Sequence, residues 1–284
     1  MSARGSLFLV ATPIGHLGDI SARAREVLDR CDVVAAEDTR RTRQLLSHLK
    51  LRKRLLSVHG HNEVQRVREV TRLLDEGKDV ALVSDAGTPL ISDPGAVMVS
   101  ALADRGYDVI SVPGPCAAIV ALTVSGLPAD RFTFVGFLPR AGKKADAAVA
   151  ELISTPGTLI LYESPRRVSA LLARLVEHLG NRRAVLCREL TKLHEEVVRG
   201  DLSDLQERAA QGLRGEVVVL VEGAAAVRAA QGVDEAAVRR RLSAGDRLRD
   251  IAREVAERSG LSSRAAYAKV LAIRNRSEQD AEGA

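Results

Sequence analysis

Five short apolar runs divide the first 114 residues, and longer segments with apolar residues at helical spacing separate them. Short Val/Ile-rich runs bounded by turn residues are typical of buried strands. Helices between such strands favour parallel pairing, with both faces of the sheet covered. We therefore predict an N-terminal parallel α/β domain over residues 1–114. Its strands are expected at 6–12, 33–37, 55–60, 79–85 and 108–114, and its helices near 20–30, 40–49, 63–76 and 94–105.

A less regular alternation follows Pro113, Gly114 and Pro115, which mark the passage to a second domain over 115–223. The segments RAVLCREL (183–190) and EEVVRG (195–200) are too close for a crossover helix, so they should pair antiparallel. The fold class is thus α/β, with a mixed sheet in the second domain. Strands are expected at 131–137, 158–164, 183–190, 195–200 and 216–223, and helices near 116–125, 143–153, 166–178 and 203–211.

An Ala/Gln-rich stretch, 224–232, is typical of a linker, and the segment 233–276 after it reads as a basic helical extension. Asp246 is expected to cap a helix that carries Leu248, Ile251, Ala252 and Val255 on one face. Gly260 should end that helix, and Ser262 or Ser263 should begin a second short one. Two helices around a turn resemble a helix-turn-helix.

The charge of the chain is unevenly distributed. Its formal net charge is +5, and residues 233–276 alone hold eleven Arg or Lys against six Asp or Glu. A second cluster, RRTRQLLSHLKLRKR (40–54), contains seven cations and no acid. Such clusters fit a partner that carries phosphates. The predicted RNA-binding residues are Arg40, Arg41, Arg43, Lys50, Arg52, Lys53 and Arg54.

Other compositional features exclude several classes of protein. The three cysteines are far apart and form no CxxC, so neither a zinc site nor a disulfide framework is expected. No apolar run is long enough to cross a bilayer, and the first residues lack the features of a signal peptide. We expect a soluble cytoplasmic protein with no metal and no membrane partner.

The segment VSDAGTPLISDPG (83–95) follows a predicted buried strand, where parallel sheets bind their ligands. A glycine such as Gly87 permits close approach of the backbone to a ligand. Ser92 or Asp93 can cap the next helix, with Pro94 in its first turn. Capping explains the end of the segment but not its length, so we expect it to bind a ligand.

The chemistry of this loop narrows the choice of ligand. The chain contains no G-x-G and no G-x-x-x-x-G-K-[ST], so it lacks both common nucleotide-phosphate fingerprints. Loops that cradle phosphates usually supply a cation, whereas this one supplies Asp85 and Asp93. A ligand with a local positive charge, for example a sulfonium, suits it better.

Several further motifs, in this order along the chain, carry a family resemblance. They are ATPIGHLGDIS (11–21), AEDTRRTRQLL (36–46), HGHNE (59–63), VPGPCAAIVALTVSGLP (112–128), FVGFLPR (134–140), LYESPRR (161–167) and RELTK (188–192). Together with residues 83–95 they resemble the small-subunit ribosomal RNA methyltransferases of the tetrapyrrole methylase superfamily. The resemblance covers roughly residues 6–223. The basic C-terminal helices also resemble that family's helix-turn-helix-like extension.

The resemblance implies S-adenosylmethionine (SAM) as cofactor, folded in a cleft between the two α/β domains. Backbone groups of several loops would hold it in place of one glycine-rich fingerprint. Phe137 would lie nearby, or else be an ordinary buried aromatic. The implied cofactor-binding residues are Pro13, Ala86, Gly87, Thr88, Ile91, Cys116, Ala117, Tyr162, Glu163, Leu190, Gly215, Glu216 and Val217.

The implied reaction is 2′-O-methylation of a cytidine ribose in the decoding region of 16S ribosomal RNA, free or in the 30S subunit. A ribose hydroxyl is a poor nucleophile, so a positioned base would help. We favour Glu37 and Asp38, with Arg40 near the substrate; Asp19, His61 and Glu63 are further candidates. Glu37–Asp38 could instead cap the following helix, and H-x-H alone is weak support for a metal site.

Two alternatives and one departure remain. A tetrapyrrole precursor C-methyltransferase would share the fold and cofactor, but a small acidic macrocycle needs no extended basic surface. A non-catalytic RNA-binding protein would need no such set of pocket motifs. The segment RELTKLHEE (188–196) departs from the family's aromatic-rich pattern, which leaves a Trp-specific contact in doubt. The superfamily also implies a homodimer.

Overall fold

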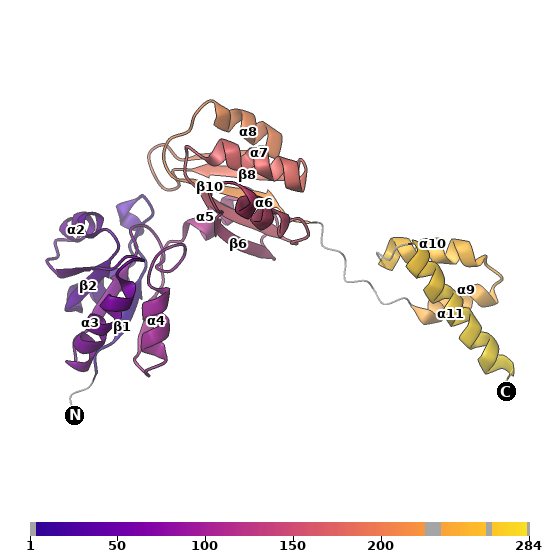
Figure 1. Cartoon of the computed structure of the whole chain (residues 1–284), viewed down its shortest axis with the longest axis horizontal. Helices are drawn as coiled ribbons and strands as arrows, with labels where there is room; N and C mark the ends of the chain where they lie inside the picture. Colours follow the sequence, from indigo (N-terminus) through magenta and orange to yellow (C-terminus); the bar gives the residue numbers. More distant parts are fainter. Residues whose placement is uncertain (1–3, 225–233, 260–262, 283–284) are drawn as a thin grey trace. The chain divides into compact units, whose positions relative to one another are not determined.

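The apolar run expected at 6–12 forms β1 (Leu7–Val10), the fourth strand of a five-stranded parallel sheet in a computed structural model of the chain. The model describes residues 4–224, 234–259 and 263–282. The sheet order is β3-β2-β4-β1-β5, and every neighbouring pair is parallel. The strands β1 and β2 are labelled in Figure 1. The other strands are β2 (Val33–Ala36), β3 (Arg54–Ser57), β4 (Val80–Val83) and β5 (Val109–Val112).

Helices cover both faces of this sheet, because its inner strands are apolar at every position. Val34 and Ala81 pack in one core with α1 (Ala22–Arg30) and the side of α2 (Thr39–His48). Val33 and Val80 pack in a second core with α3 (Glu63–Asp75) and α4 (Ala96–Ala103). A short 3-10 helix, Leu17–Asp19, precedes α1. The predicted parallel α/β architecture is confirmed.

The second sheet has the order β6-β7-β10-β8-β9. Only β6 and β7 pair parallel, and β8 pairs antiparallel with β9 as the short connection predicts. The helices α6, α7 and α8 pack on one face and α5 on the other. The elements are α5 (Ala117–Ser125), β6 (Phe132–Phe137), α6 (Lys143–Ala150), β7 (Thr158–Glu163), α7 (Val168–Leu179), β8 (Arg183–Arg188), β9 (Glu196–Asp201), α8 (Leu202–Ala210) and β10 (Val217–Glu222).

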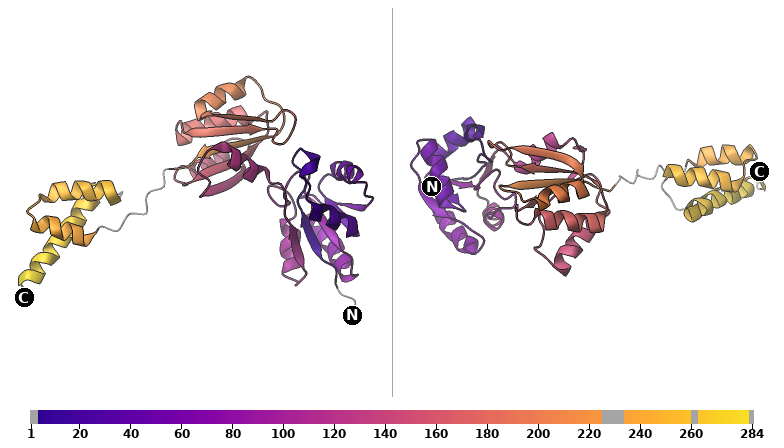
Figure 2. Two further views of the ribbon diagram at one scale, coloured as in Figure 1. Left: turned by 180° about the vertical axis from the view of Figure 1, so that it is seen from behind. Right: turned by 90° about the horizontal axis from the view of Figure 1, so that it is seen from above.

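Residues Met1–Gly223 form one unit, and Ala224–Ala284 form a second unit that is helical where it is described. Three helices, α9 (Glu235–Ser243), α10 (Leu248–Ser259) and α11 (Ser263–Glu282), pack against one another (Figure 2). Their core contains Val238, Ile251, Ala252, Val270 and Ile273.

The prediction of two short helices here was wrong in three respects. The prediction did not include α9 as a separate helix. It also expected a short last helix, whereas α11 has 20 residues. Asp246 is not in the N-cap position, because α10 begins two residues later at Leu248, and its carboxylate accepts a hydrogen bond from Arg241 Nε at 2.6 Å. Gly260 and Ser262 lie outside the described residues, as does the expected linker from 225 onward. Within the described chain, no helix is long and apolar enough to cross a membrane.

Candidate functional site

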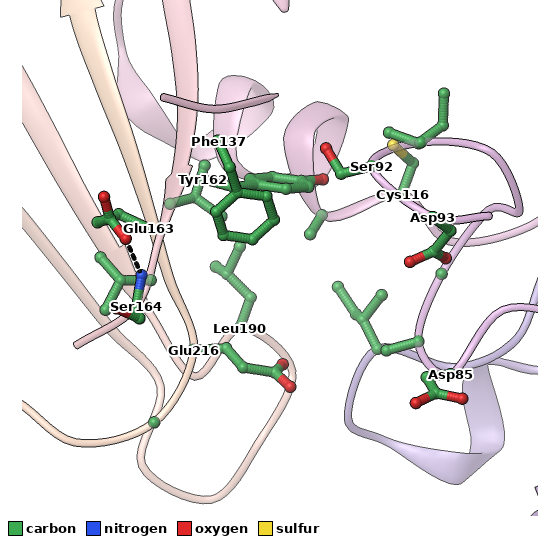
Figure 3. Close-up of a pocket in the computed structure, with 18 of the residues that line it drawn as sticks. Asp85, Ser92, Asp93, Cys116, Phe137, Tyr162, Glu163, Ser164, Leu190 and Glu216 are labelled. Carbon is green, nitrogen blue, oxygen red and sulfur yellow. Dashed lines mark hydrogen bonds between the residues drawn. The ribbon is translucent and has the colours of Figure 1, made fainter. Parts of the chain in front are cut away.

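Loops and strand ends from both sheets line one pocket of about 420 Å³ within the first unit (Figure 3). The size is that of a small-molecule site. The loop after β4 is its main contributor from the first sheet, and β7 and β10 contribute from the second. Its lining residues are Ile14, Glu37, Arg41, Asp85, Ala86, Gly87, Thr88, Ile91, Ser92, Asp93, Cys116, Ala117, Phe137, Tyr162, Glu163, Ser164, Pro165, Cys187, Leu190, Gly215, Glu216, Val217 and Val218.

The loop after β4 is fixed by its own backbone. Gly87 and Thr12 exchange two backbone hydrogen bonds, of 2.9 and 3.1 Å, which join the loop to the end of β1. Gly87 has φ +91°, and a Cβ there would lie 3.2 Å from Ile14 Cγ2 and 3.4 Å from the Pro115 carbonyl oxygen. Gly87→Val would therefore strain the loop as well as narrow the pocket. Because this substitution changes the loop and the pocket together, weaker cofactor binding by the variant would not by itself show a direct contact.

The expectation that Ser92 or Asp93 caps α4 was wrong. Gly95 is the N-cap residue, and no side chain caps the helix. The Asp93 carboxylate instead accepts a hydrogen bond from the Ser84 hydroxyl, which ties the far end of the loop to β4. Leu90 and Ser92 both have positive φ, +72° and +65°. Strained non-glycine residues are retained where the surrounding structure fixes them, commonly at binding sites.

The half of the pocket that belongs to the first sheet is acidic. Partial burial raises the pKa of Glu37, and the neighbouring Asp93 and Asp85 raise it further. Burial also raises the pKa of Asp93, against the opposing effect of its bond from Ser84. Asp85 accepts the Asp38 backbone N–H at 2.9 Å, and Arg41 Nε lies 3.9 Å from its other oxygen. This half therefore favours a ligand with a positive charge.

The opposite half is largely apolar and aromatic, although Glu163 and Glu216 also line it. Phe137 and Phe134 meet Tyr162 edge to face, with ring centroids 5.7 and 5.0 Å apart. The Tyr162 hydroxyl accepts the Ala118 backbone N–H at 3.0 Å, and burial raises its pKa well above the usual range. Phe137 is 56% exposed and faces the pocket in Figure 3. Leu190 extends this surface. Such a wall suits a flat aromatic group.

Glu163 lines the pocket, but its carboxylate has a structural task. It is 4% exposed, accepts the Ser164 N–H at 2.7 Å and lies 3.0 Å from Arg167 Nη2 (Figure 3). A buried carboxylate with these two partners holds the turn after β7 in place. Glu163 therefore shapes the site through the backbone of Ser164.

The segment 189–195 joins the two halves of the pocket. Lys192 Nζ lies 2.9 Å from Glu189 and 3.1 Å from Glu216, so it connects the segment to the start of β10. Thr191 Oγ1 accepts the backbone N–H of His16 at 3.1 Å, across from the loop after β1. Glu189 and Thr191 both have positive φ. The segment that departs from the family pattern thus carries a contact between the two α/β parts.

Twelve of the thirteen cofactor candidates line this pocket. Pro13 does not, because its neighbour Ile14 points into the pocket in its place. Five further residues line the pocket that were not predicted from the sequence: Ile14, Ser164, Pro165, Cys187 and Val218. Ile14 and Ser164–Pro165 lie inside quoted motifs, so the motifs were the available signal. Cys187 and Val218 lie on strands, and only the strand register places them beside Tyr162.

The catalytic candidates separate clearly. Glu37 lines the pocket, whereas Asp38 and Arg40 do not. Asp38 is the N-cap of α2, and a side-chain hydrogen bond from Arg40 lowers its pKa to about 2. The interpretation of Asp38 as a helix cap is therefore the one the structure supports.

The remaining base candidates lie outside the pocket lining. Glu63 is buried and accepts the Met98 backbone N–H at 2.9 Å, so it anchors α4. The Asp19 carboxylate oxygen Oδ1 lies 3.9 Å from His16 Nδ1. The rings of His59 and His61 are 6.1 Å apart, and the described residues contain no group of three or more side chains that could hold a metal ion.

Four of the seven predicted RNA-binding cations already have partners. Arg40 pairs with Asp38 at 2.9 Å, Arg41 lies near Asp85, and Arg54 pairs with Glu69 at 3.0 Å. Lys53 Nζ donates to the Asp29 and Cys31 carbonyls at the end of α1, a favourable position for a cation. Arg43, Lys50 and Arg52 have no hydrogen-bond or ion-pair partner for their side chains among the described residues.

Comparisons with known proteins agree with this geometry. Residues 6–206 match the model of the family described as Tetrapyrrole (Corrin/Porphyrin) Methylases. A protein named ribosomal RNA small subunit methyltransferase I from Mycobacterium tuberculosis (strain CDC 1551 / Oshkosh) is 46% identical over 274 residues, which cover 95% of this chain and 96% of that protein. A protein of the same name from Escherichia coli O157:H7 is 45% identical over 226 residues, covering 78% of this chain and 79% of that protein.

A solved structure shares the fold. Uroporphyrin-III C-methyltransferase from Thermus thermophilus, complexed with S-adenyl homocysteine, superposes with a TM-score of 0.56 at 20% identity. The match covers 77% of this chain and 97% of that one.

Proposed function

Because this chain belongs to the tetrapyrrole (corrin/porphyrin) methylase family, and within it to the ribosomal RNA small subunit methyltransferase I group, we propose that it uses SAM to methylate 16S ribosomal RNA. The acceptor is the 2′-hydroxyl of a cytidine in the decoding region. The observation that carries the proposal is the two-sided pocket, acidic on the first sheet and aromatic on the second.

The residues of the pocket fit SAM group by group. Phe137, Tyr162 and Leu190 offer a wall against which adenine can lie. Asp85 and Asp93 supply negative charge for the sulfonium and ammonium groups. The backbone around Ala86–Thr88 and Cys116–Ala117 allows close approach, because these side chains are small. The cofactor candidates that line the pocket are proposed to bind SAM in this way, and Ile14 takes the place of Pro13.

Glu37 is proposed as the base that accepts the proton of the ribose hydroxyl. It lines the pocket, and its pKa is raised by partial burial and by two neighbouring carboxylates. A carboxylate with a raised pKa binds a proton more firmly, so it accepts one more readily from a developing alkoxide. The rest of the rate would come from alignment of the hydroxyl with the methyl group.

The tetrapyrrole C-methyltransferase alternative has the same fold and cofactor but a different acceptor. The relatives described above are named for ribosomal RNA, whereas the solved uroporphyrin-III C-methyltransferase is 20% identical and shows only the fold. A non-catalytic RNA-binding protein remains testable by SAM binding alone. We further propose a cytoplasmic homodimer, with the helical unit 234–282 helping to recruit RNA.

The test of this function has two parts. Calorimetry of the full chain should show SAM bound at one site per chain; absence of binding would leave only the non-catalytic alternative. Mass spectrometry of 16S ribosomal RNA after incubation with SAM should show one added methyl on a cytidine ribose. Free 16S RNA and assembled 30S subunits, tested in parallel, identify the preferred substrate. Methylation of a tetrapyrrole precursor with no methylation of RNA would overturn the proposal.

A further inference from the structure

A second hollow, of about 690 Å³, lies between the C-terminal half of α2 and the edge strand β3. It is distinct from the SAM pocket, since the two share no lining residue. Leu46, Leu51 and Leu55 contribute apolar surface, and its remaining residues are polar or cationic. The hollow is lined by Arg43, Leu46, Ser47, Lys50, Leu51, Arg52, Lys53 and Leu55.

All three cations of the 40–54 cluster that lack a partner among the described residues are in this lining. Arg43, Lys50 and Arg52 are exposed and make no described ion pair, whereas Lys53 is held by backbone carbonyls. Among the residues that the structure describes, no carboxylate lines the hollow. Three free cations around an apolar floor match a phosphate backbone with its attached bases and sugars.

Lys50 carries an additional observation. The helix α2 ends in a Schellman motif, with Leu51 N–H bonded to the Leu46 carbonyl and Lys50 N–H to the Ser47 carbonyl. Lys50 is the residue of that motif with φ +60°, a position where glycine is strongly favoured. A lysine there strains the backbone and, within the described chain, makes no side-chain bond that would offset the strain. The ammonium group of Lys50 therefore lies at the hollow although a lysine at this position lowers the stability of the backbone turn relative to glycine.

The helix α2 also links this hollow to the reaction site. Its first turn supplies Arg41 to the SAM pocket, while Arg43 and Ser47 of the same helix, with Lys50 just after its end, line the hollow. Its ten residues span about 15 Å, a distance that a few nucleotides of an extended strand can cover. A strand whose ribose lies beside Glu37 can therefore continue along α2.

We propose that this hollow is a binding site for single-stranded RNA, in which Arg43, Lys50 and Arg52 contact consecutive phosphates of the substrate. This inference rests on the proposed function for the choice of RNA as the ligand. It restricts the phosphate-contacting part of the 40–54 cluster to three of its seven cations, and it assigns Lys53 and Arg54 to the fold.

The decisive variant is Lys50→Gly in the full chain. Glycine suits the backbone at this position, so the thermal midpoint should stay the same or rise, while affinity for a fluorescent oligouridine of about 20 nucleotides should fall several-fold. The slope of log K against log salt should decrease by about 0.7. Unchanged RNA affinity and slope in a stable Lys50→Gly protein would overturn the inference.

A triple variant, Arg43→Gln, Lys50→Gln and Arg52→Gln, should reduce the salt slope by about 2. Arg68→Gln, an exposed cation on α3 that has no described partner, is the matched control on the other face of the sheet. Arg54→Gln removes a cation of the same segment that is already paired. Both controls should leave the slope nearly unchanged, and an equal loss in either would show general charge attraction and refute a defined site.

Ser47→Glu adds bulk and a negative charge inside the hollow, and Ser100→Glu makes the same change on an exposed face of α4. Both residues lie in the last turn of their helix, so the two variants share the cost of a negative charge at a helix end. Only the first should weaken RNA binding. Light scattering of the triple variant checks the competing occupant, because loss of a dimer would identify the hollow as an interface between copies. SAM calorimetry separates the two hypotheses. If the triple variant binds SAM, methylates RNA and keeps its RNA affinity, the RNA site in the hollow is refuted and the proposed function is retained.

Discussion

The two halves of the proposed SAM pocket line the same cavity by different structural means. The half from the first sheet consists of loops after parallel strands, and its acidic side chains are Glu37, Asp85 and Asp93. The half from the second sheet consists largely of strand faces. Tyr162, Val218 and Cys187 lie in register across β7, β10 and β8 and all line the pocket.

This difference explains which half can recognise charge. Loops can turn backbone N–H groups and short acidic side chains toward a ligand. They stay in place through backbone hydrogen bonds to neighbouring strands and through strained residues such as Leu90 and Ser92. Strand faces present side chains at a period of two, held by a buried core on the same face. In the proposed mode of SAM binding, charge recognition would therefore fall mainly to the first sheet and shape recognition to the second.

The largest effect should come from Glu37→Gln on the acidic half. If Glu37 is the base, the methyl transfer rate should fall by roughly 10² to 10⁴ while SAM affinity stays within a few-fold. Single-turnover kinetics with saturating RNA measures the rate, and calorimetry measures SAM binding. Asp38→Asn is the control, because asparagine also caps helices well and Asp38 does not line the pocket. An equal loss in Asp38→Asn would reassign the catalytic role.

On the aromatic half, Phe137→Ala should weaken SAM binding about tenfold, which corresponds to about 1.4 kcal/mol of lost stacking. Free adenosine should lose affinity in parallel, whereas a change confined to SAM would contradict an adenine contact. Phe132→Ala on the same strand is matched, since Phe132 is 42% exposed and does not line the pocket. Calorimetry with both ligands makes the comparison.

A chain that ends at Gly232 tests whether both halves of the pocket are complete without the helical unit. The unit has its own core, so the first unit should remain folded and bind SAM normally. Methyl transfer should decrease several-fold through a higher KM for RNA, with kcat nearly unchanged. A loss of SAM affinity, or dissociation of a dimer, would show that the helices stabilise the catalytic part.

The smallest effect concerns Asp93→Asn. Replacement of one carboxylate should lower the preference for SAM over S-adenosylhomocysteine by roughly threefold, because only SAM carries the sulfonium charge. Burial raises the folded-state pKa of Asp93, so the folded protein loses stability as pH rises through that pKa. The variant should therefore melt higher than the parent at neutral pH, with the difference vanishing in acid. Equal melting at both pH values would argue against the raised pKa.

The sequence was sufficient to predict both sheets, because period and turn residues are local signals. The number and length of the helices in the C-terminal unit were harder to predict. The helices α9 and α11 are stabilised mainly by tertiary packing of residues such as Val238 and Ile273, which a local sequence pattern does not reveal. The domain boundaries proposed at 114 and 223 stay predictions, although the first unit does end at Gly223.

The lining residues of the pocket could be predicted where they belong to sequence motifs, but not where only the three-dimensional structure brings them to the pocket. Gly87 and Ala117 follow from quoted loops. Asp93 was expected to cap α4, because nothing in the sequence shows that Ser84 would be its partner. The pairing of Arg54 with Glu69, and of Lys53 with carbonyls of α1, also depends on contacts distant in sequence. Charge clusters therefore predict a basic surface but not which cations remain free.

The length of α2 has a consequence for the selection of the methylated nucleotide. With one end beside Glu37, the proposed base, and the other beside Lys50, this helix would fix the spacing between two contacts on one RNA strand. Nucleotide choice would then be a matter of counting along the strand from an anchored phosphate. An enzyme with one extra turn in this helix would shift the methyl mark along the RNA while using the same cofactor site.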